Sequence, residues 1–460
     1  MKNYLAGYHN CRCGREHSTN LKEIEISKDA HKKLPELLER YGYHSVYLIA
    51  DQNTMKAAGE EVLSILTKAH ILVTVCLFEE ETLIPNETAL GKLLAKLPTS
   101  VDLVMSVGTG TLNDLGKYIS DKFHLPFYIV ATAPSMDGFA SNVSCLILEH
   151  MKTTLPTHVP EAIIADLSVL AAAPSKMIAA GIGDILGKYI ALLDWKLSSV
   201  LTGEYHCEYV ETMVRQSIDT IISTIDEEQS NELSDSNRTW SLKAVGKIME
   251  ALVLSGIAMS FVGNSRPASG SEHHLSHFWE LDFLQNNLPP VLHGIKVGIG
   301  TVTAIRLYRL LLTTVDTAGA PDFESAHTHI ENFSYPFWQS EMRQYYGQGA
   351  DEVLRLEEQV HKNGVVEVSQ RLDILKQHWC KIEALIKSYL PSYDRFVSLL
   401  EKAGAPTKPK QEAINSTLVY NSILFAKELR NRYGLLQLLF DLGLSEIFAT
   451  QLAELTEEEL

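Results

Sequence analysis

Three histidines stand within five positions of the segment SRPASGSEHHLSHFWE, residues 265–280. If this segment is helical, His273 and His277 are four residues apart and share one face, whereas His274 points about a quarter turn away. Two of the three imidazoles can therefore serve one site, and imidazole nitrogen is a common ligand of divalent transition metals. The competing interpretation is a partly polar helix that carries imidazoles for packing alone.

Two further segments carry residues of metal-ligating type. Asp184 in AAGIGDILGKYIALLDW follows flexible glycines, and we expect it at the start of a long helix; His293 in VLHGIKVGIGT comes just before another predicted helix. One carboxylate and two imidazoles, from Asp184, His273 and His293, would suit Zn²⁺ or a related divalent ion and leave a coordination position for a substrate. Because these residues are far apart in the sequence, the sequence alone leaves open whether they meet.

A pair of glycines marks a candidate phosphate-binding turn. GTGTLNDLGKYIS follows the predicted strand VDLVMSV and leads into a helix that we expect to begin near Leu112. Gly108 and Gly110 would let backbone amides approach a diphosphate at the helix N-terminus, although tight turns also use glycine for geometry alone. Asp51, at the end of YLIADQNT, could accept hydrogen bonds from a ribose diol and repel a 2′-phosphate, or could cap a helix. Together the two features favour a nucleotide site that prefers NAD(H), with NADP(H) as the second cofactor.

The segment CRCGREH, residues 11–17, brings two cysteines and a histidine close together. Cys11, Cys13 and His17 supply too few ligands in a common zinc spacing, so we favour a turn before the first strand over a metal knuckle. The chain has six cysteines in all, and in a long intracellular chain they indicate thiols rather than a disulfide framework.

Composition excludes some classes of partner. The net charge of −17 and the pI near 5.5 speak against nucleic acid, because its binding depends on clustered Lys and Arg. The sequence has no run of about 18 apolar residues, and the segment MKNYLAGYHNCRCGREH has no apolar signal core. We therefore expect no membrane insertion and a cytoplasmic location.

The elements that would position these residues fall into two halves. From about residue 21 to 170, short β-rich runs alternate with helical segments, as in a parallel α/β sheet: SVYLIAD, ILVTVCLF, VDLVMSVG, PFYIVAT and AIIADL. Beyond residue 175 the long stretches have helical periodicity, and the polar runs 226–238 and 402–411 are typical of loops. We predict an N-terminal segment (1–20), an α/β nucleotide-binding domain (21–172) and an all-helical metal- and substrate-binding domain (173–460).

Several motifs carry a resemblance to a known family. In chain order, ATAPSMDGFASNVS, GIGD, SRPASGSEHHLSH, LHGIKVG and AGAPTKP resemble the sn-glycerol-1-phosphate dehydrogenases, a branch of the iron-containing alcohol dehydrogenase and glycerol dehydrogenase superfamily, over residues 21 to 445 or so. The resemblance implies the dehydroquinate synthase-like fold: a Rossmann-like domain for NAD(P)H, a helical domain that holds a metal, and an active site in the cleft between them. It also implies a reversible reduction of dihydroxyacetone phosphate to sn-glycerol 1-phosphate, a lipid backbone. We expect the chain to form a homo-oligomer, a homodimer.

The resemblance also implies a metal-ligand set. The family's ligands fall on Asp184, His273 and His293, and His277 matches the second, non-ligand histidine of the family's H-x-x-x-H. Iron-dependent relatives carry a fourth ligand histidine four residues after the aspartate, where this chain has Lys188. This departure favours Zn²⁺ or Ni²⁺ over a four-ligand Fe²⁺ site.

The cofactor residues that the resemblance implies lie in the predicted α/β domain. The diphosphate loop and its neighbour match Gly108, Thr109, Gly110, Asn113 and Asp114, and the other cofactor contacts match Thr132, Ser135 and Ser141. Asp137 matches a residue near the nicotinamide and the substrate.

The implied reaction assigns roles to the remaining candidates. The ketone would be polarised by the metal as hydride arrives from the nicotinamide, Asp137 would orient the substrate hydroxyl, and His277 or a metal-linked water would deliver the proton. Lys188 and Arg266 would bind the substrate phosphate. Otherwise Lys188 pairs with a carboxylate and Arg266 caps a helix.

Three other functions stay open at this point. A glycerol dehydrogenase acting on unphosphorylated polyols would need no cations around the substrate tail. A cyclase resembling dehydroquinate synthase shares the fold, but its metal site leads with Glu where this chain has Asp184. A non-catalytic nucleotide-binding relative would not need intact Asp184, His273 and His293. The role of the extension at 317–375, which is longer than in the short archaeal forms, also stays open.

Overall fold

The computed structural model describes residues 1–149, 151–229 and 240–458. The chain forms two compact units, each built from non-contiguous segments. The first unit comprises Met1–Leu148, Lys152–Ile185 and Glu208–Pro267, and the second comprises Glu149–Met151, Leu186–Cys207 and Ala268–Leu460. The sequence predicts one boundary, between residues 172 and 173, whereas in the structure segments 175–185 and 208–262 pack within the first unit.

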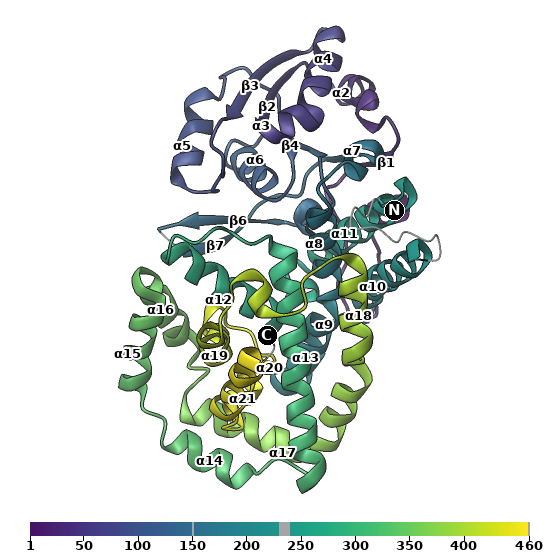
Figure 1. Ribbon diagram of the computed structural model, residues 1–460. Helices are drawn as coiled ribbons and strands as arrows, with labels where there is room; N and C mark the ends of the chain where they lie inside the picture. Colours follow the sequence, from purple (N-terminus) through teal and green to yellow (C-terminus); the bar gives the residue numbers. More distant parts are fainter. Residues whose placement is uncertain (150, 230–239, 459–460) are drawn as a thin grey trace. The chain divides into compact units, whose positions relative to one another are not determined.

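The first unit is built on a six-stranded sheet with the order β1-β8-β5-β4-β2-β3 (Figure 1). Its strands, all paired in parallel, are β1 (Glu23–Ser27), β2 (Ser45–Asp51), β3 (Leu72–Phe78), β4 (Leu103–Gly108), β5 (Phe127–Ala131) and β8 (Ala162–Asp166). Strands β2, β4, β5 and β8 are buried almost throughout, which accounts for their continuous apolar runs. The predicted parallel α/β sheet is confirmed.

Three strands in the described residues were not predicted from the sequence. Strand β1 lies at the sheet edge, and its sequence EIEIS alternates acidic and apolar side chains, which keeps an exposed edge charged. Strands β6 (Val143–Leu148) and β7 (Met151–Pro156) form a separate two-stranded sheet.

Helices cover both faces of the six-stranded sheet (Figure 1). They include α2 (Leu34–Tyr41), α4 (Glu60–Lys68), α5 (Glu87–Lys96) and α6 (Gly110–Lys122). Leu38 of α2 and Val62 of α4 belong to the apolar core that also contains Val46 and Leu48 of β2. Tyr47, which points to the opposite face because strand side chains alternate, donates its hydroxyl to the Leu93 carbonyl of α5 at 2.8 Å. This doubly wound arrangement leaves the carboxyl ends of the strands open for ligands.

The first unit also contains the long helices α8 (Ser175–Leu186), α10 (Glu208–Gln229) and α11 (Leu242–Val262), and the short helices α1 (Lys2–Leu5), α3 (Gln52–Thr54) and α7 (Leu167–Ala171). Helix α11 is long and apolar enough to cross a membrane by length and composition, but 78% of its most apolar 18-residue window is buried inside the structure. It packs along α10 as a core helix. Because α10 extends to Gln229, the start of the predicted loop 226–238 is helical; residues 230–238 lie outside the described residues.

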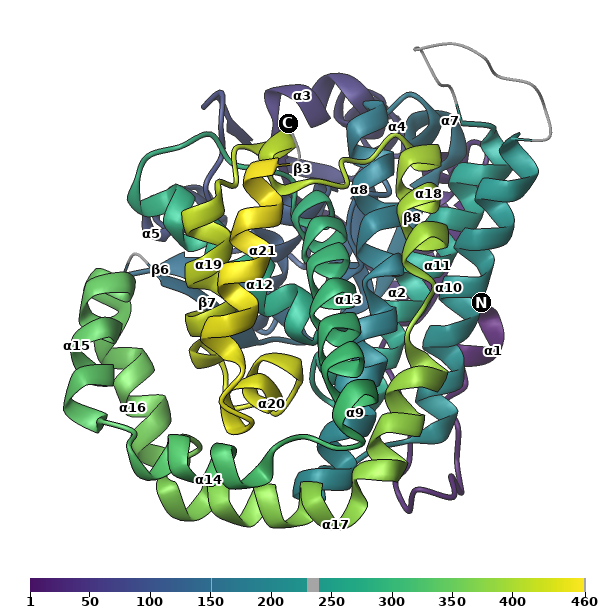
Figure 2. The same cartoon turned by 60° about the horizontal axis from the view of Figure 1, so that its bottom comes forward.

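The second unit is helical, as the sequence predicts, and no strand follows β8 among the described residues. Its longer helices are α9 (Lys188–Thr202), α12 (Ser271–Gln285), α13 (His293–Ala318), α14 (Phe323–Glu331), α15 (Tyr335–Tyr346), α16 (Ala350–Val360), α17 (Val365–Tyr389), α18 (Tyr393–Ala403), α19 (Ser416–Phe425) and α21 (Ser445–Glu458), with the shorter α20 (Leu435–Asp441). Helix α12 packs along α13, and α19 packs along α21 (Figure 2).

The 317–375 extension forms α14, α15, α16 and the start of α17, which follow one another along the periphery of the second unit (Figure 2). It is anchored on the buried carboxylate of Glu428. Trp338 Nε1 donates to Glu428 at 3.1 Å and Asn363 Nδ2 at 2.9 Å, while Lys362 Nζ lies 3.0 Å from the second carboxylate oxygen. These contacts give the extension a structural role within this unit.

Candidate functional site

The carboxyl ends of β2 and β4 form the switch point of the sheet. Strand β2 has β3 on one side and β4 on the other, so the connections that leave these two strand ends diverge, and ligands of doubly wound sheets bind where this happens. Ile49 of β2 pairs with Ser106 of β4. Asp51 and Gly108, each two residues further on, therefore end their strands side by side, and both predicted nucleotide contacts stand at the same edge.

The turn after β4 is built around its two glycines. Helix α6 begins at Gly110, two residues before the predicted start near Leu112. A Cβ on Gly108 would lie 2.5 Å from Leu112 Cδ1, so packing alone requires glycine there. A Cβ on Gly110 would meet only Met136 Cγ, at 3.9 Å. Space beside Gly110 is therefore open, as a ligand that approaches the backbone requires.

The first amides of α6 have no side-chain cap from the residue that precedes them. Thr109 occupies the N-cap position, but its hydroxyl lies 2.7 Å from Ser135 Oγ and makes no capping hydrogen bond. Thr132, at the end of β5, donates its backbone N–H to the Gly108 carbonyl at 3.1 Å. Uncapped amides at a helix N-terminus favour an anion, and the turns after β4 and β5 are joined by these contacts.

Asn113, Asp114 and Ser141 take part in a network that fixes the segment after β5. Asn113 Nδ2 donates to the Gly138 carbonyl at 3.3 Å, and Asp114 Oδ2 accepts from Cys145 N–H at 3.2 Å. Buried Asn113 Oδ1 has no hydrogen-bond partner in the described part of the chain. Asn113 Oδ1 could therefore accept a hydrogen bond from a bound ligand.

Lys117 is the centre of that network, a role that was not predicted from the sequence. Its ammonium is fully buried and donates to the Gly138 carbonyl at 3.0 Å, to Ser141 Oγ at 3.0 Å and to the Val143 carbonyl at 2.7 Å. Burial lowers the pKa of Lys117 and raises the pKa of Asp114, and each charge partly offsets the shift of the other. Asp114 and Lys117 are three residues apart on α6, and this spacing was the one sign in the sequence that the two charges could pair.

Asp51 caps a short helix at the end of β2. Its Oδ1 accepts from Thr54 N–H at 2.8 Å, and the Thr54 hydroxyl accepts from Asp51 N–H at 3.0 Å. The cap occupies one carboxylate oxygen, so the capping role and the predicted ribose contact are compatible.

Asp137 and Asp184 are linked within the first unit. Asp137 N–H donates to Asp184 Oδ2 at 3.0 Å, and Asp137 Oδ2 accepts from the hydroxyl of Ser255 in α11 at 2.9 Å. Two glycines permit this approach: a Cβ on Gly181 would lie 1.9 Å from the Pro134 carbonyl oxygen, and one on Gly256 would lie 2.9 Å from that of Asp137. Asp184 stands near the end of α8, not at the start of a long helix as expected, because α8 begins at Ser175.

Three imidazoles cluster in the second unit. His273 and His277 lie on α12 and His293 is the first residue of α13. The ring centroids of His273 and His293 are 5.2 Å apart, and His277 lies 5.9 Å from the first and 5.7 Å from the second. Candidate ligand nitrogens of His273 and His293 lie within 4.8 Å of each other. The predicted helical face of His273 and His277 is present, and His293 joins it.

Glu272 orients His273. Its Oε1 lies 2.6 Å from His273 Nδ1 and also accepts from Gly270 N–H at 2.9 Å. A carboxylate on Nδ1 keeps the proton there and leaves Nε2 as the basic nitrogen, which is the arrangement of a metal-ligating histidine. The carboxylate of Glu272 stands beside the histidines in the sequence, but the sequence did not predict its role.

Asp194 of α9 fixes the start of α12. Its Oδ2 accepts from Ser271 N–H at 2.8 Å and its Oδ1 accepts from the Tyr308 hydroxyl of α13 at 2.6 Å. Burial, together with the Asp194 charge, raises the pKa of Tyr308 well above its ordinary value. One buried carboxylate thus joins α9, α12 and α13, and no sequence spacing marks it.

The two predicted phosphate-binding cations are both buried. Lys188 is the first residue of α9, and Arg266 lies in a short 3₁₀ helix (Arg266–Ala268), where its backbone N–H donates to Asn264 Oδ1 at 2.8 Å.

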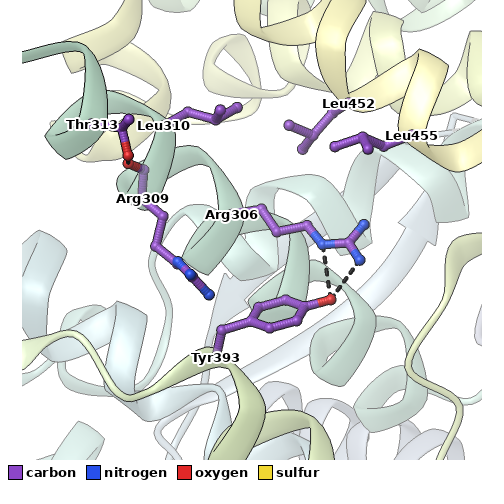
Figure 3. A pocket seen from close by; sticks show the side chains of 7 residues that line it. All are labelled: Arg306, Arg309, Leu310, Thr313, Tyr393, Leu452 and Leu455. Atoms are coloured by element: carbon purple, nitrogen blue, oxygen red, sulfur yellow. Dashed lines mark hydrogen bonds between the residues drawn. The ribbon is translucent and has the colours of Figure 1, made fainter.

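A separate cavity of about 320 Å³ lies further along α13 (Figure 3). Arg306, which lines it, donates from Nε to the Tyr393 hydroxyl at 3.0 Å. At a rise of about 1.5 Å per residue, Arg306 is about 20 Å along the helix from His293. The cavity is therefore distinct from the imidazole cluster. Its lining is Arg306, Arg309, Leu310, Thr313, Tyr393, Leu452 and Leu455.

Known proteins resemble this chain in fold and in sequence. A glycerol dehydrogenase from Schizosaccharomyces pombe has a TM-score of 0.57 at 15% identity, with 95% of this chain and 92% of that one covered. An NADH-dependent butanol dehydrogenase from Thermotoga maritima has a TM-score of 0.58 at 14% identity, with 93% and 96% covered. At these identities the likeness shows the fold alone.

Sequence comparison is more specific. Residues 25–174 match the family model described as iron-containing alcohol dehydrogenase. A protein of Geobacillus thermodenitrificans named glycerol-1-phosphate dehydrogenase (NAD(P)+) is 33% identical over 442 residues, which cover 95% of this chain and 96% of that one. A protein of the same name from Halalkalibacterium halodurans is 38% identical over 70% of this chain and 80% of its own. The chain belongs to the iron-containing alcohol dehydrogenase family, in the branch of the glycerol-1-phosphate dehydrogenases.

Proposed function

We propose that this protein is a metal- and NAD(P)H-dependent dehydrogenase that reversibly reduces dihydroxyacetone phosphate to sn-glycerol 1-phosphate. The observation that carries the proposal is the imidazole cluster of His273, His277 and His293, with Glu272 on His273 Nδ1. The chain that contains this cluster is itself 33% identical, over 95% of its length, to a protein named glycerol-1-phosphate dehydrogenase.

Asp184, His273 and His293 are the proposed ligands of one divalent ion, Zn²⁺ or Ni²⁺. Their donor set of one carboxylate and two imidazoles suits either ion, and the Glu272 contact supports a metal-ligating role for His273. When bound, the ion polarises the ketone oxygen, and the nicotinamide supplies the hydride.

The chain's own residues position the cofactor and handle the proton. The open amides at the start of α6 would receive the diphosphate, and Asp51 would receive the ribose diol. Thr109, Asn113, Thr132 and Ser135 line the same turns, while Asp114 and Ser141 hold the network around Lys117. Asp137, held by Ser255, would orient the substrate hydroxyl, and His277 would deliver the proton to the new alkoxide.

Lys188 and Arg266 are the proposed partners of the substrate phosphate. Both side chains are buried and carry the positive charge that attracts a phosphate dianion. Arg266 adds the two-pronged geometry that suits phosphate oxygens. The substrate is thus a phosphorylated triose; we further propose a homodimer located in the cytoplasm.

The proposal is tested by NADH oxidation with dihydroxyacetone phosphate or dihydroxyacetone as substrate. The chelator-treated protein should be inactive, and added Zn²⁺ or Ni²⁺ should restore turnover of the phosphorylated ketone. Similar kcat/KM values for the two ketones would instead indicate a glycerol dehydrogenase. NADH binding without turnover of either ketone would indicate a non-catalytic relative.

The proposed preference for NADH is tested in the same assay. The charge of Asp51 would repel the 2′-phosphate of NADPH, so Asp51→Gly should narrow the difference in kcat/KM between the two cofactors. A higher kcat/KM for NADPH in the unmodified protein would show that Asp51 acts only as the helix cap.

A further inference from the structure

The N-terminal segment holds a second cluster of metal-ligating side chains, and the proposed reaction makes no use of it. One ligand atom from each of Cys11, Cys13 and His17 lies within 4.8 Å of the others, and Cys13 Sγ is 3.4 Å from His17 Nε2. Zinc–sulfur and zinc–nitrogen bonds of about 2.3 and 2.0 Å place tetrahedral ligands about 3.5 Å apart. The separation of Cys13 and His17 fits such a pair.

His17 is oriented as a metal ligand. Its ring is fully buried, and Nδ1 lies 3.1 Å from the carbonyl oxygen of Phe261 in α11. A carbonyl only accepts hydrogen bonds, so Nδ1 carries the proton and Nε2 presents its lone pair. That lone pair is on the side of Cys13 Sγ. Backbone carbonyls hold metal-ligating histidines in the same way.

The backbone between these residues is folded into a tight loop. Gly14 N–H donates to the Cys11 carbonyl at 2.9 Å, and Gly14 has a φ of +80°, which favours glycine. Tyr8 and His17 close the loop with two backbone hydrogen bonds, of 2.7 and 3.1 Å. The turn therefore holds Cys11 and Cys13 close to His17.

A fourth ligand is available from a distant part of the sequence. Cys207 is fully buried and directly precedes Glu208, the first residue of α10. The ring of Tyr209, two residues further on, stacks on Tyr8 at 4.0 Å and lies 6.0 Å from the ring of His17. Chain connectivity therefore brings Cys207 to the same neighbourhood, and its residue type completes the set.

We propose that Cys11, Cys13, His17 and Cys207 bind one structural zinc ion. Three cysteines and one histidine form a closed tetrahedral set with no position left for a substrate, so the ion would stabilise the fold without taking part in chemistry. It would attach the N-terminal segment to the start of α10. The competing explanation of the same geometry is a plain hydrogen bond from the Cys13 thiol to His17.

Titration with Co²⁺ distinguishes the two explanations. The full-length protein is stripped of metal under reducing conditions and titrated with Co²⁺, which replaces zinc and reports its ligands. Bound thiolates give an intense charge-transfer band in the near ultraviolet, whereas a carboxylate and imidazole site does not. In Asp184→Ala, which lacks one ligand of the other proposed metal site, we expect the band to saturate with about one equivalent of Co²⁺ per chain. In this variant and in the unmodified protein the band should disappear when Zn²⁺ is added.

Variants assign the band to these residues. Cys11→Ser, Cys13→Ser and Cys207→Ser should each reduce it, because its intensity grows with the number of bound thiolates. Asp184→Ala should keep it, so the result does not depend on the proposed reaction. The matched control is Cys380→Ser, which removes an exposed thiol of α17 and should leave the band unchanged.

Absence of the band in the reduced wild-type protein overturns the proposal, whatever the variants do. A band of unchanged intensity in both Cys11→Ser and Cys13→Ser also overturns it, and one unchanged in Cys207→Ser overturns the four-ligand site. Should the cysteine variants fail to fold, Asp184→Ala provides the second measurement: added Zn²⁺ should raise its Tm. An unchanged Tm would contradict the inference.

Discussion

The hydrogen bond between Glu272 Oε1 and His273 Nδ1, at 2.6 Å, is the most specific single contact around the proposed metal ligands. Glu272→Gln keeps the size of the side chain but replaces an ionised acceptor with a neutral amide. Changes of this kind weaken metal affinity about 10–100-fold. We therefore expect Glu272→Gln to need correspondingly more free Ni²⁺ for half-maximal NADH oxidation.

The control for this prediction is His274→Ala, on the same helix. His274 is buried, but it is not part of the ring cluster of His273, His277 and His293 among the described contacts. Its removal should leave the Ni²⁺ dependence nearly unchanged. Equal Ni²⁺ dependence of Glu272→Gln and the unmodified protein would show that Glu272 does not support a metal ligand.

A variant of Lys188 tests whether the substrate is phosphorylated. We expect Lys188→Ala to raise KM for dihydroxyacetone phosphate by roughly one to two orders of magnitude, as for the loss of a charge-assisted contact. Turnover of dihydroxyacetone should hardly change, and the comparison of the two ketones separates substrate binding from a general loss of structure. A parallel loss with both ketones would assign Lys188 a structural role.

Site residues were predictable from the sequence where the residue type and its immediate neighbours indicate the role, and not where the role depends on a partner distant in the sequence. Gly108, Gly110 and Asp51 were found because each stands at the end of an apolar run. Asp194 and Ser255 were missed because their roles depend on hydrogen bonds to Ser271, Tyr308 and Asp137, which are remote in the sequence. Long-range pairs of this kind leave no periodicity to detect.

At the scale of elements, Gly300 sets how closely α13 approaches α12. A Cβ at this position would lie 2.5 Å from the backbone oxygen of Glu272, next to His273. Because that atom belongs to the backbone, the two helices must shift to admit it. We expect Gly300→Ala to lower the free energy of unfolding by about 1–3 kcal/mol and to weaken Ni²⁺ activation, measured by denaturant unfolding and by metal titration.

Gly91 in α5 is the matched control for Gly300. A Cβ there would meet no atom within 4 Å. Gly91→Ala should raise the free energy of unfolding by about 0.5–1 kcal/mol, because alanine is the better helix former. A neutral or stabilising Gly300→Ala would show that the approach of the two helices is not tight.

Strands were predictable from the sequence where burial on both faces requires a continuous run of apolar residues. The strands that are covered on both faces appear as apolar runs, and β3 retains enough of this pattern at the sheet edge to be found. Strand β1 was not found, because its alternating EIEIS lacks such a run. The position of Asp184 was misplaced for another reason: the small residues of AAGIGD indicated a turn, although Gly181 is needed for close packing inside α8.

At the scale of the whole molecule, a buried ionic cluster links acid stability to the 317–375 extension. Burial by itself would raise the pKa of Glu428, but Lys362 and Lys427 together lower it from 4.5 to about 2. The folded pKa is therefore below the unfolded value. The resulting stabilisation is complete above the unfolded value and is lost as the pH falls from about 4.5 towards about 2.

A shift of this size corresponds to about 3 kcal/mol. We expect Glu428→Gln to lower the free energy of unfolding near neutral pH by about 3–5 kcal/mol, because it removes the negative charge beside two buried cations. The free energy of unfolding of this variant should also fall less steeply below about pH 4.5 than that of the unmodified protein. Glu352→Gln, which breaks an exposed pair with Arg355, should cost less than about 1 kcal/mol. Equal urea-unfolding profiles for the two variants between neutral pH and pH 3 or so would contradict this.

The identity of the product tests the proposed function most directly. After reduction of dihydroxyacetone phosphate by NADH in the presence of Ni²⁺ or Zn²⁺, the product is offered to an NAD-linked dehydrogenase specific for sn-glycerol 3-phosphate. We predict complete NADH consumption in the first step and no oxidation of the product in the second, because it is sn-glycerol 1-phosphate. Oxidation of the product, or first-step consumption that is the same after removal of the metal, would contradict the proposed function.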